Sequence, residues 1–175
     1  MMKDARKVLY LSLDGTVRKG PQELGHPILS IEDLEILPGV PDLLARYKEE
    51  GWLIAGLVNH GEVALGMLTS DDMGEVEMHS HLLCGETFDK ILICQHHPDA
   101  EDPEYARCWC RIPRIGLVVE GAVDLSILND GDHFPPHLAL FVGATEEDRL
   151  CAEAANIDFR WARDWRAEID QEGLS

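Results

Sequence analysis

The chain is short of positive charge, with 15 lysines and arginines against 33 aspartates and glutamates and a formal net charge of −18 over 175 residues. Proteins that bind nucleic acids or anionic membranes neutralise phosphate groups with lysine and arginine, so neither partner is expected. No apolar run approaches the ~18 residues of a membrane-spanning helix. The composition is otherwise ordinary, at 45% hydrophobic and 27% charged residues, and indicates a globular protein with an acidic surface.

The chain also lacks the pattern of a secretory signal. Residues 1–7 are basic, but the apolar run behind them stops at Ser12 and no small-residue cleavage site follows. There is no internal repeat and no low-complexity tract. A chain of this length suits one domain, residues 1–175, which can bury roughly 70% of its unfolded surface. We therefore expect a single cytoplasmic domain.

Short apolar runs alternate with helical stretches along the sequence. This alternation is typical of an α/β fold, a doubly wound and mainly parallel sheet flanked by helices. The apolar runs that predict strands are residues 8–13, 53–58, 91–93, 138–142 and the shorter 159–161. The predicted helices are residues 41–50, 115–128 and 146–155, with a short helix within the acidic stretch 69–82. Residues 18–36 read as a loop with one helical turn, and about the last eight residues as a frayed end.

Binding sites in such sheets lie outside the carboxyl ends of the strands. The residues that follow the predicted strands are therefore the candidates for function. They are residues 12–16, 58–61, 94–113 and 143–148.

Cysteine and histidine gather in one of these segments. Cys94, His96, Cys108 and Cys110 form a C-x-H … C-x-C pattern, and four such ligands suit a closed tetrahedral Zn²⁺ site that folds the loop. The alternative is that these thiols and imidazoles share a loop by chance. His97 is also a possible ligand, although we favour His96. The pairs His79/His81 and His133/His137 have no thiol or carboxylate company and are interpreted as surface residues.

Several short motifs together resemble the haloacid-dehalogenase (HAD) phosphatases of subfamily IIIA, the branch with heptose-bisphosphate and histidinol-phosphate phosphatases. The resemblance covers residues 8–157. The motifs that carry it are Leu11-Ser12-Leu13-Asp14-Gly15-Thr16, Val58-Asn59, the loop Cys94…Cys110-Arg111-Ile112-Pro113, and Val142-Gly143-Ala144…Glu147-Asp148. It implies a HAD-like Rossmannoid fold with a zinc-binding loop over residues 94–113 and no large cap domain.

The resemblance also assigns roles to individual positions, and four of them are replaced here. Ser12 stands at the position of the family's nucleophilic aspartate, and Val58 at that of its phosphate-binding threonine or serine. Ile112 stands at the position of the family's lysine, and Ala144 at that of its Mg²⁺-binding aspartate. The acid/base Asp14 is retained. Mg²⁺ is therefore not expected, and we expect no catalysis, because phosphoryl transfer needs a nucleophile and positive charge.

The retained residues leave a candidate ligand-binding cleft, made of Ser12, Asp14, Thr16, Asn59 and Arg111. We expect it to be poor in polar and cationic groups. Three functions remain open: a pseudophosphatase that binds a small molecule or a protein, an active phosphomonoesterase with atypical residues, and a structural interaction subunit. Trp109, Trp161 and Trp165 are interpreted as packed side chains, with anchors for a partner protein as the alternative. The acidic run 99–104 is interpreted as a solvated loop, with a docking site for a basic partner as the alternative.

Overall fold

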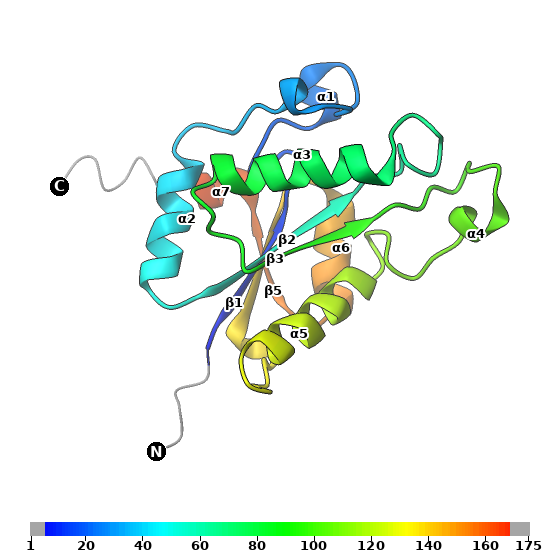
Figure 1. Cartoon of the computed structure of the whole chain (residues 1–175). Helices are drawn as coiled ribbons and strands as arrows, with labels where there is room; N and C mark the ends of the chain where they lie inside the picture. Colours follow the sequence, from blue (N-terminus) through cyan, green and yellow to red (C-terminus); the bar gives the residue numbers. More distant parts are fainter. Residues whose placement is uncertain (1–5, 169–175) are drawn as a thin grey trace.

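Five parallel strands form one sheet in the order β3-β2-β1-β4-β5. The computed structural model describes residues 6–168, and Figure 1 views the sheet from the β3 edge. The strands are β1 (Val8–Ser12), β2 (Leu53–Asn59), β3 (Lys90–Cys94), β4 (Ala139–Gly143) and β5 (Asp158–Trp161). β1 lies in the centre and is fully buried. This sheet confirms the predicted fold class.

The strand register brings the carboxyl ends together at one edge. Ser12 pairs with Leu57 of β2, Leu11 pairs with Val142 of β4, and Asn59 pairs with Cys94 of β3. Because all pairs are parallel, the loops that follow β1, β2, β3 and β4 leave the sheet side by side. The candidate segments named from the sequence therefore meet in space.

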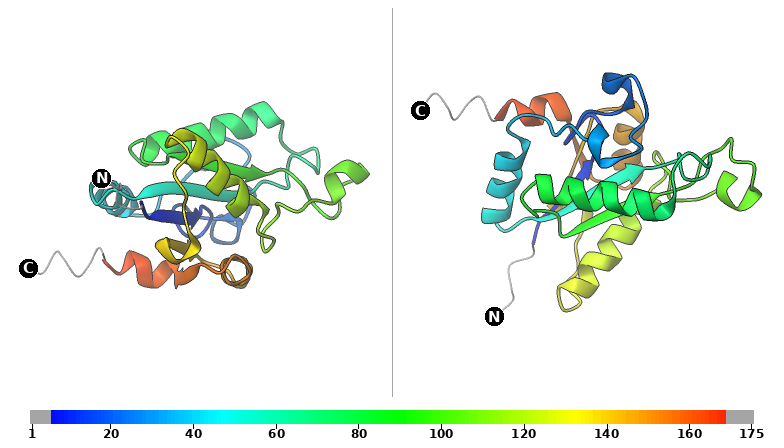
Figure 2. Two further views of the ribbon diagram at one scale, coloured as in Figure 1. Left: turned by 90° about the horizontal axis from the view of Figure 1, so that it is seen from below. Right: turned by 45° about the horizontal axis from the view of Figure 1, so that its top comes forward.

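Helices cover both faces of the sheet, as the two views of Figure 2 show. α5 and α6 pack on one face, while α2 and α7 pack on the other together with the end of α3. The bounds are α1 Pro21–Leu24, α2 Val40–Glu49, α3 Ser70–Leu83, α4 Pro103–Ala106, α5 Gly116–Leu128, α6 Glu146–Ala154 and α7 Ala162–Arg166, with 3₁₀ turns η1 Ile31–Asp33 and η2 Pro136–Leu138. α4 lies far out on a long loop that projects from the sheet (Figure 1).

The central strand divides the core in two. Side chains of a strand alternate between faces, so Val8 and Tyr10 belong to the core under α5 and α6, whereas Leu9 and Leu11 belong to the core under α2 and α7. Trp165 is fully buried in this second core. It packs as predicted.

Most predicted elements are present, with three differences. α3 runs over 14 residues because Thr69 caps its first turn, accepting from the backbone N–H of Asp72; the acidic stretch is a full helix. Residues 18–36 hold α1 and also η1. The sequence did not predict α4 and α7, which are only 4 and 5 residues long.

The other expectations concern exposed residues and the chain end. Trp109 and Trp161 are 59% and 38% exposed, so packing accounts for Trp165 but not for these two. Residues 99–104 are mostly exposed, as a solvated loop should be. The frayed end lies largely in residues 169–175, outside the described residues. Within the described part of the chain, no helix has the length and apolar character to cross a membrane.

Candidate functional site

A cavity of about 410 Å³ lies where the loops after β1, β2, β3 and β4 converge. Its lining contains four of the five predicted cleft residues, Ser12, Asp14, Asn59 and Arg111. Three of the four replaced positions also line it, namely Ser12, Val58 and Ile112. The remaining lining residues are Leu57, Pro113, Thr145, Glu147 and Asp148. The structure therefore brings together segments that are up to 136 residues apart in the sequence (12 to 148).

Thr16 and Ala144 are the exceptions. Thr16 is fully buried and does not line this cavity; its hydroxyl has no hydrogen-bond partner within the described residues. Ala144 instead lines a neighbouring cavity beside Gly15 and Arg166. The placement of Thr16 in the cleft is thus corrected: its side chain turns into the protein interior below the β1 loop.

Ser12, at the end of β1, lies beside the carboxylate of Asp148 in the first turn of α6, and its hydroxyl acts to lower the pKa of that carboxylate. Asp148 Oδ2 accepts from the backbone N–H groups of Ala144 and Thr145, at 2.9 Å each. Burial raises the pKa of Asp148 and outweighs these contacts. Ser12 therefore lies next to a partly desolvated carboxylate.

Asp14 is ion-paired with Arg18. Arg18 Nε lies 2.7 Å from Asp14 Oδ1, and the same guanidinium binds both carboxylate oxygens of Glu77 in α3, at 2.8 and 3.1 Å. A further bond of 2.7 Å reaches the Ser80 hydroxyl. Burial alone would lower the pKa of Arg18, but the carboxylates of Glu77 and Asp14 outweigh it and raise that pKa. Arg18 is fully buried and fixes Asp14 from inside the protein.

His60 extends this chain of charges. Its Nε2 lies 2.8 Å from Glu77 Oε1 and its Nδ1 lies 3.4 Å from Glu62 Oε2. Burial lowers the pKa of His60, but the nearby Glu62 carboxylate and the hydrogen bond to Glu77 outweigh it and raise the pKa to about 9. His60 is therefore an imidazolium at neutral pH. The network that we call the buried ion chain consists of Asp14, Arg18, Glu77, His60 and Glu62.

The wall of the cleft is held in place by Asn59. Its side-chain amide accepts from the backbone N–H of Ile112 at 3.2 Å and donates to the Ile112 carbonyl at 3.3 Å. Arg111 donates to the His96 carbonyl at 3.0 Å. The cleft is poor in cations, as expected, because Arg111 is the one cation among the described lining residues. It is not poor in polar groups, because Asp14, Glu147 and Asp148 also line it.

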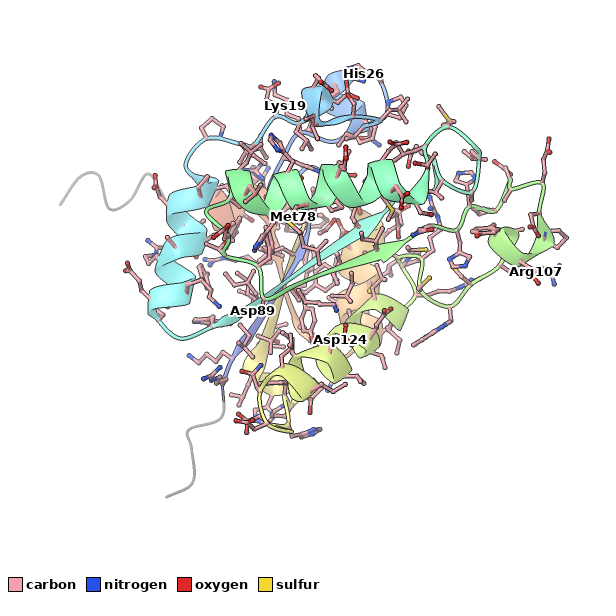
Figure 3. All side chains as sticks on the ribbon, in the orientation of Figure 1. Lys19, His26, Met78, Asp89, Arg107 and Asp124 are labelled. Carbon is pink, nitrogen blue, oxygen red and sulfur yellow. The ribbon has the colours of Figure 1, made fainter. Side chains whose placement is uncertain are left out.

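The four predicted metal ligands converge in the projecting loop, whose outer end is marked by Arg107 in Figure 3. The ligand atoms of Cys94, His96, Cys108 and Cys110 all lie within 4.8 Å of one another. Cys94 Sγ is 3.7 Å from Cys108 Sγ and 3.6 Å from His96 Nδ1. A tetrahedron with metal–sulfur bonds of about 2.3 Å has edges of about 3.8 Å, so this cluster can hold a metal ion.

His97 stands outside the cluster. Its Nδ1 accepts from the backbone N–H of Asp99 at 3.1 Å. Within residues 6–168 the other histidine pairs join no group of three candidate ligands. Gly116 allows the cluster to close against α5, because a Cβ there would lie 2.6 Å from the Trp109 carbonyl oxygen.

Sequence reasoning missed several residues of the cleft and of the buried ion chain. Asp148 belongs to a family-like motif, but the sequence did not predict it as a cleft residue. It lies in the first turn of α6, four residues after Ala144, and this places it at the carboxyl ends of the strands. Arg18, Glu77 and His60 gave no usable signal, because long-range ion pairs follow no local spacing. Only the tertiary fold brings them together.

Comparison with known proteins gives one consistent result, although no family model matches the chain. A Thermoplasma volcanium protein named "Probable D-glycero-D-manno-heptose-1,7-bisphosphate 7-phosphatase" is 30% identical over 124 residues, 69% of this chain and 78% of that protein. The D-glycero-beta-D-manno-heptose-1,7-bisphosphate 7-phosphatase of Yersinia pestis is 29% identical over 160 residues, 89% of this chain and 79% of that protein.

A solved structure has the same fold. The D,D-heptose 1.7-bisphosphate phosphatase from B. bronchiseptica, complexed with magnesium and phosphate, superposes with a TM-score of 0.70 at 21% identity. The match covers 93% of this chain and 86% of that chain.

Proposed function

Because this chain belongs to the HAD superfamily, in the family of the D-glycero-D-manno-heptose-1,7-bisphosphate 7-phosphatases, we propose that it is a degenerate member whose cleft binds a ligand without hydrolysing it. The observation that carries this proposal is the state of the nucleophile position. Ser12 supplies a hydroxyl where the family has a carboxylate. A serine hydroxyl is a weak nucleophile at neutral pH, and in-line attack on phosphorus also needs positive charge around the transferred group.

The electrostatics of the cleft support the same proposal. Phosphoryl transfer develops negative charge that lysine, arginine or a metal ion must stabilise. Ile112 supplies no charge at the lysine position, and Arg111 faces Asp14, Glu147 and Asp148 across the same cavity. An anionic phosphate would meet an excess of carboxylates. An uncharged ligand suits this cleft better.

The residues also fit Mg²⁺ poorly. Magnesium prefers an octahedral set of oxygen ligands. Ala144 offers no side-chain oxygen, one oxygen of Asp14 is bound to Arg18, and one oxygen of Asp148 is bound to two backbone N–H groups. We derive no catalytic step through this ion.

The cysteine–histidine cluster fits Zn²⁺ well, and we propose that zinc is its metal. Three thiolates and one imidazole are ligands that tetrahedral zinc prefers, and four protein ligands leave no open position for catalysis. The backbone N–H of Arg111 donates to Cys108 Sγ at 3.3 Å, as in loops that bind a thiolate. Bound zinc would fix residues 94–113, and with them Arg111 and Ile112 at the cleft.

An active phosphomonoesterase is the second candidate. The names of the relatives favour it, and so does one contact in the cleft. If Asp148 accepts the Ser12 proton, Ser12 Oγ can bond to phosphorus as the ester P–O bond breaks, and protonated Asp148 returns that proton to the leaving alkoxide. Water then hydrolyses the Ser12 phosphoester, which releases inorganic phosphate and restores the hydroxyl. In this case both Ser12→Ala and Asp148→Asn abolish turnover.

A phosphatase assay separates the two candidates. The wild-type protein is assayed against a heptose bisphosphate, histidinol phosphate and an aryl phosphate with Mg²⁺ present. We expect the wild type and Ser12→Ala to be equally inactive. The matched control is Ser70→Ala, at an exposed serine that begins α3 and does not line the cavity. Turnover above ~1 s⁻¹ that Ser12→Ala abolishes and Ser70→Ala spares contradicts the proposal.

The ligand-binding half of the proposal has its own test. A thermal-shift comparison of uncharged sugars with their phosphates measures which class stabilises the fold. We expect stabilisation by uncharged compounds only, and its loss in Asp14→Asn. Stabilisation by phosphates alone contradicts it. Restoring four family residues together, as Ser12→Asp, Val58→Thr, Ile112→Lys and Ala144→Asp, should be needed before phosphatase activity returns, because such groups act as a unit.

A further inference from the structure

A second cavity lies between α5 and α6, on the sheet face opposite α2 and α7. Its volume is about 470 Å³, which is within the range of small-molecule sites. α5 contributes Val118, Ala122 and Val123 to the walls, and Ala155 and Ile157 lie opposite. Figure 3 marks the position of α5 with Asp124. None of these residues lines the phosphatase cleft.

The floor of this cavity carries an unsatisfied polar group. Tyr10 of β1 lines the cavity and is only 2% exposed. Its ring lies against α5 at Gly121, where a Cβ would be 3.3 Å from Tyr10 Cε1. Within residues 6–168 the Tyr10 hydroxyl makes no hydrogen bond to the protein, and its oxygen is not among the fully buried unpartnered atoms, so it stays accessible from the cavity. A hydroxyl that faces a mainly apolar cavity without a protein partner favours a ligand that accepts a hydrogen bond from it.

The character of the cavity defines the ligand class. Its walls are mainly aliphatic, and its few polar side chains include Ser126, Asp132 and His133. Burial raises the pKa of Tyr10 to about 12, so the phenol is protonated at neutral pH and acts as a donor. The net charge of −18 disfavours an anion such as a fatty acid.

We propose that this cavity binds an uncharged, mainly apolar small molecule whose carbonyl or ether oxygen accepts a hydrogen bond from Tyr10. The apolar rim formed by Val123 and Ile127, which are 53% and 73% exposed, closes over the apolar part of that ligand. A second copy of the chain is disfavoured as the occupant, because two proteins of charge −18 repel each other. The proposal is independent of what the phosphatase cleft does.

The first test uses Nile red, an uncharged solvatochromic dye, with the full-length protein. We expect saturable binding of one dye per chain with a blue-shifted emission. Ala122→Trp fills the cavity and should weaken binding at least about tenfold. The matched control is Ala45→Trp, which makes the same change at an exposed site of α2 on the other sheet face. Equal binding by the two variants, or none by the wild type, overturns the proposal.

Two competitors test the chemical class. 2-Decanone and decanoate have the same chain length, but only decanoate is charged. We expect 2-decanone to displace the dye at a lower concentration, and Tyr10→Phe to weaken 2-decanone about three- to tenfold because one hydrogen bond is lost. Tyr10→Phe preserves the shape of the core, so this arm remains decisive if Ala122→Trp does not fold. Equal competition by decanoate, or an unchanged affinity in Tyr10→Phe, refutes the ligand class.

The oligomeric state tests the other occupant. Light scattering on the eluting wild-type protein should give a monomer mass with and without the dye. A dimer that Ala122→Trp dissociates, in a protein that does not bind Nile red, overturns the proposal in favour of a second copy on this face.

Discussion

Removing the cation of the buried ion chain should unfold the protein far more readily than removing an exposed one. In Arg18→Met the carboxylate of Glu77 loses two bonds, at 2.8 and 3.1 Å, and Asp14 loses one of 2.7 Å. The Arg18 and Glu77 side chains are 0% and 4% exposed, so water cannot replace these bonds. Breaking a buried ion pair from one side costs about 3 to 5 kcal/mol.

The assay is urea denaturation at neutral pH, followed by circular dichroism. For a chain of this size, a loss of about 3 to 5 kcal/mol in the free energy of unfolding would also lower the Tm in a thermal melt by about 6 to 20 °C. Glu77 keeps His60 as a cationic partner in Arg18→Met, so the two substitutions are compared in a double-mutant cycle: Glu77→Gln should cost less in the Arg18→Met background than in the wild type. This coupling separates the electrostatic cost from a packing cost.

The matched control is Arg149→Met in α6. Arg149 also pairs with two carboxylates, those of Glu146 and Glu153, but these pairs are exposed and we expect only a small change in the midpoint. A loss in Arg18→Met no larger than in Arg149→Met, or a cost of Glu77→Gln that is the same with and without Arg18, refutes the reasoning.

Four further outcomes follow from the described contacts. Protein purified without added zinc should contain one Zn²⁺ per chain, and Cys110→Ala should lose it; a metal content near zero in the wild type contradicts the zinc proposal. Calorimetric titration with Mg²⁺ should detect no site of micromolar affinity. A micromolar site in the wild type that is lost in Asp14→Ala would show that the cleft binds this ion. Trp165→Ala, in the second core, should cost about 3 to 5 kcal/mol of unfolding free energy, and a cost below about 1 kcal/mol would show that the core collapses around the gap. Thr16→Val should be neutral or stabilising in urea denaturation, because it replaces a buried unpartnered hydroxyl with a methyl group; a clear destabilisation would reveal a partner for that hydroxyl.

The sheet and the gathering of the cleft residues were predictable because both follow from local rules. Apolar runs predict parallel strands, and parallel strands deliver their carboxyl ends to one edge, which placed Ser12, Asn59 and Arg111 correctly. The spacing of Cys94, His96, Cys108 and Cys110 predicted the cluster for the same reason. Thr16 was misplaced because nothing in the sequence indicates to which side a residue in a tight turn points.

The buried ion chain lies beyond such rules. Arg18 and Glu77 are 59 residues apart, and a lone arginine in a loop is normally solvated. Similarly, Tyr10 belongs to an apolar run, and the sequence gives no sign that its hydroxyl lacks a partner. Both features depend on which helices pack beside β1.

The position of Ser12 beside Asp148 limits which single substitutions this site tolerates. Ser12→Asp by itself would place a second carboxylate against Asp148, in a cleft whose described lining has Arg111 as its one cation. Two carboxylates in contact cannot both ionise without cost. A carboxylate at position 12 is therefore compatible with this cleft only if a further positive charge is introduced with it.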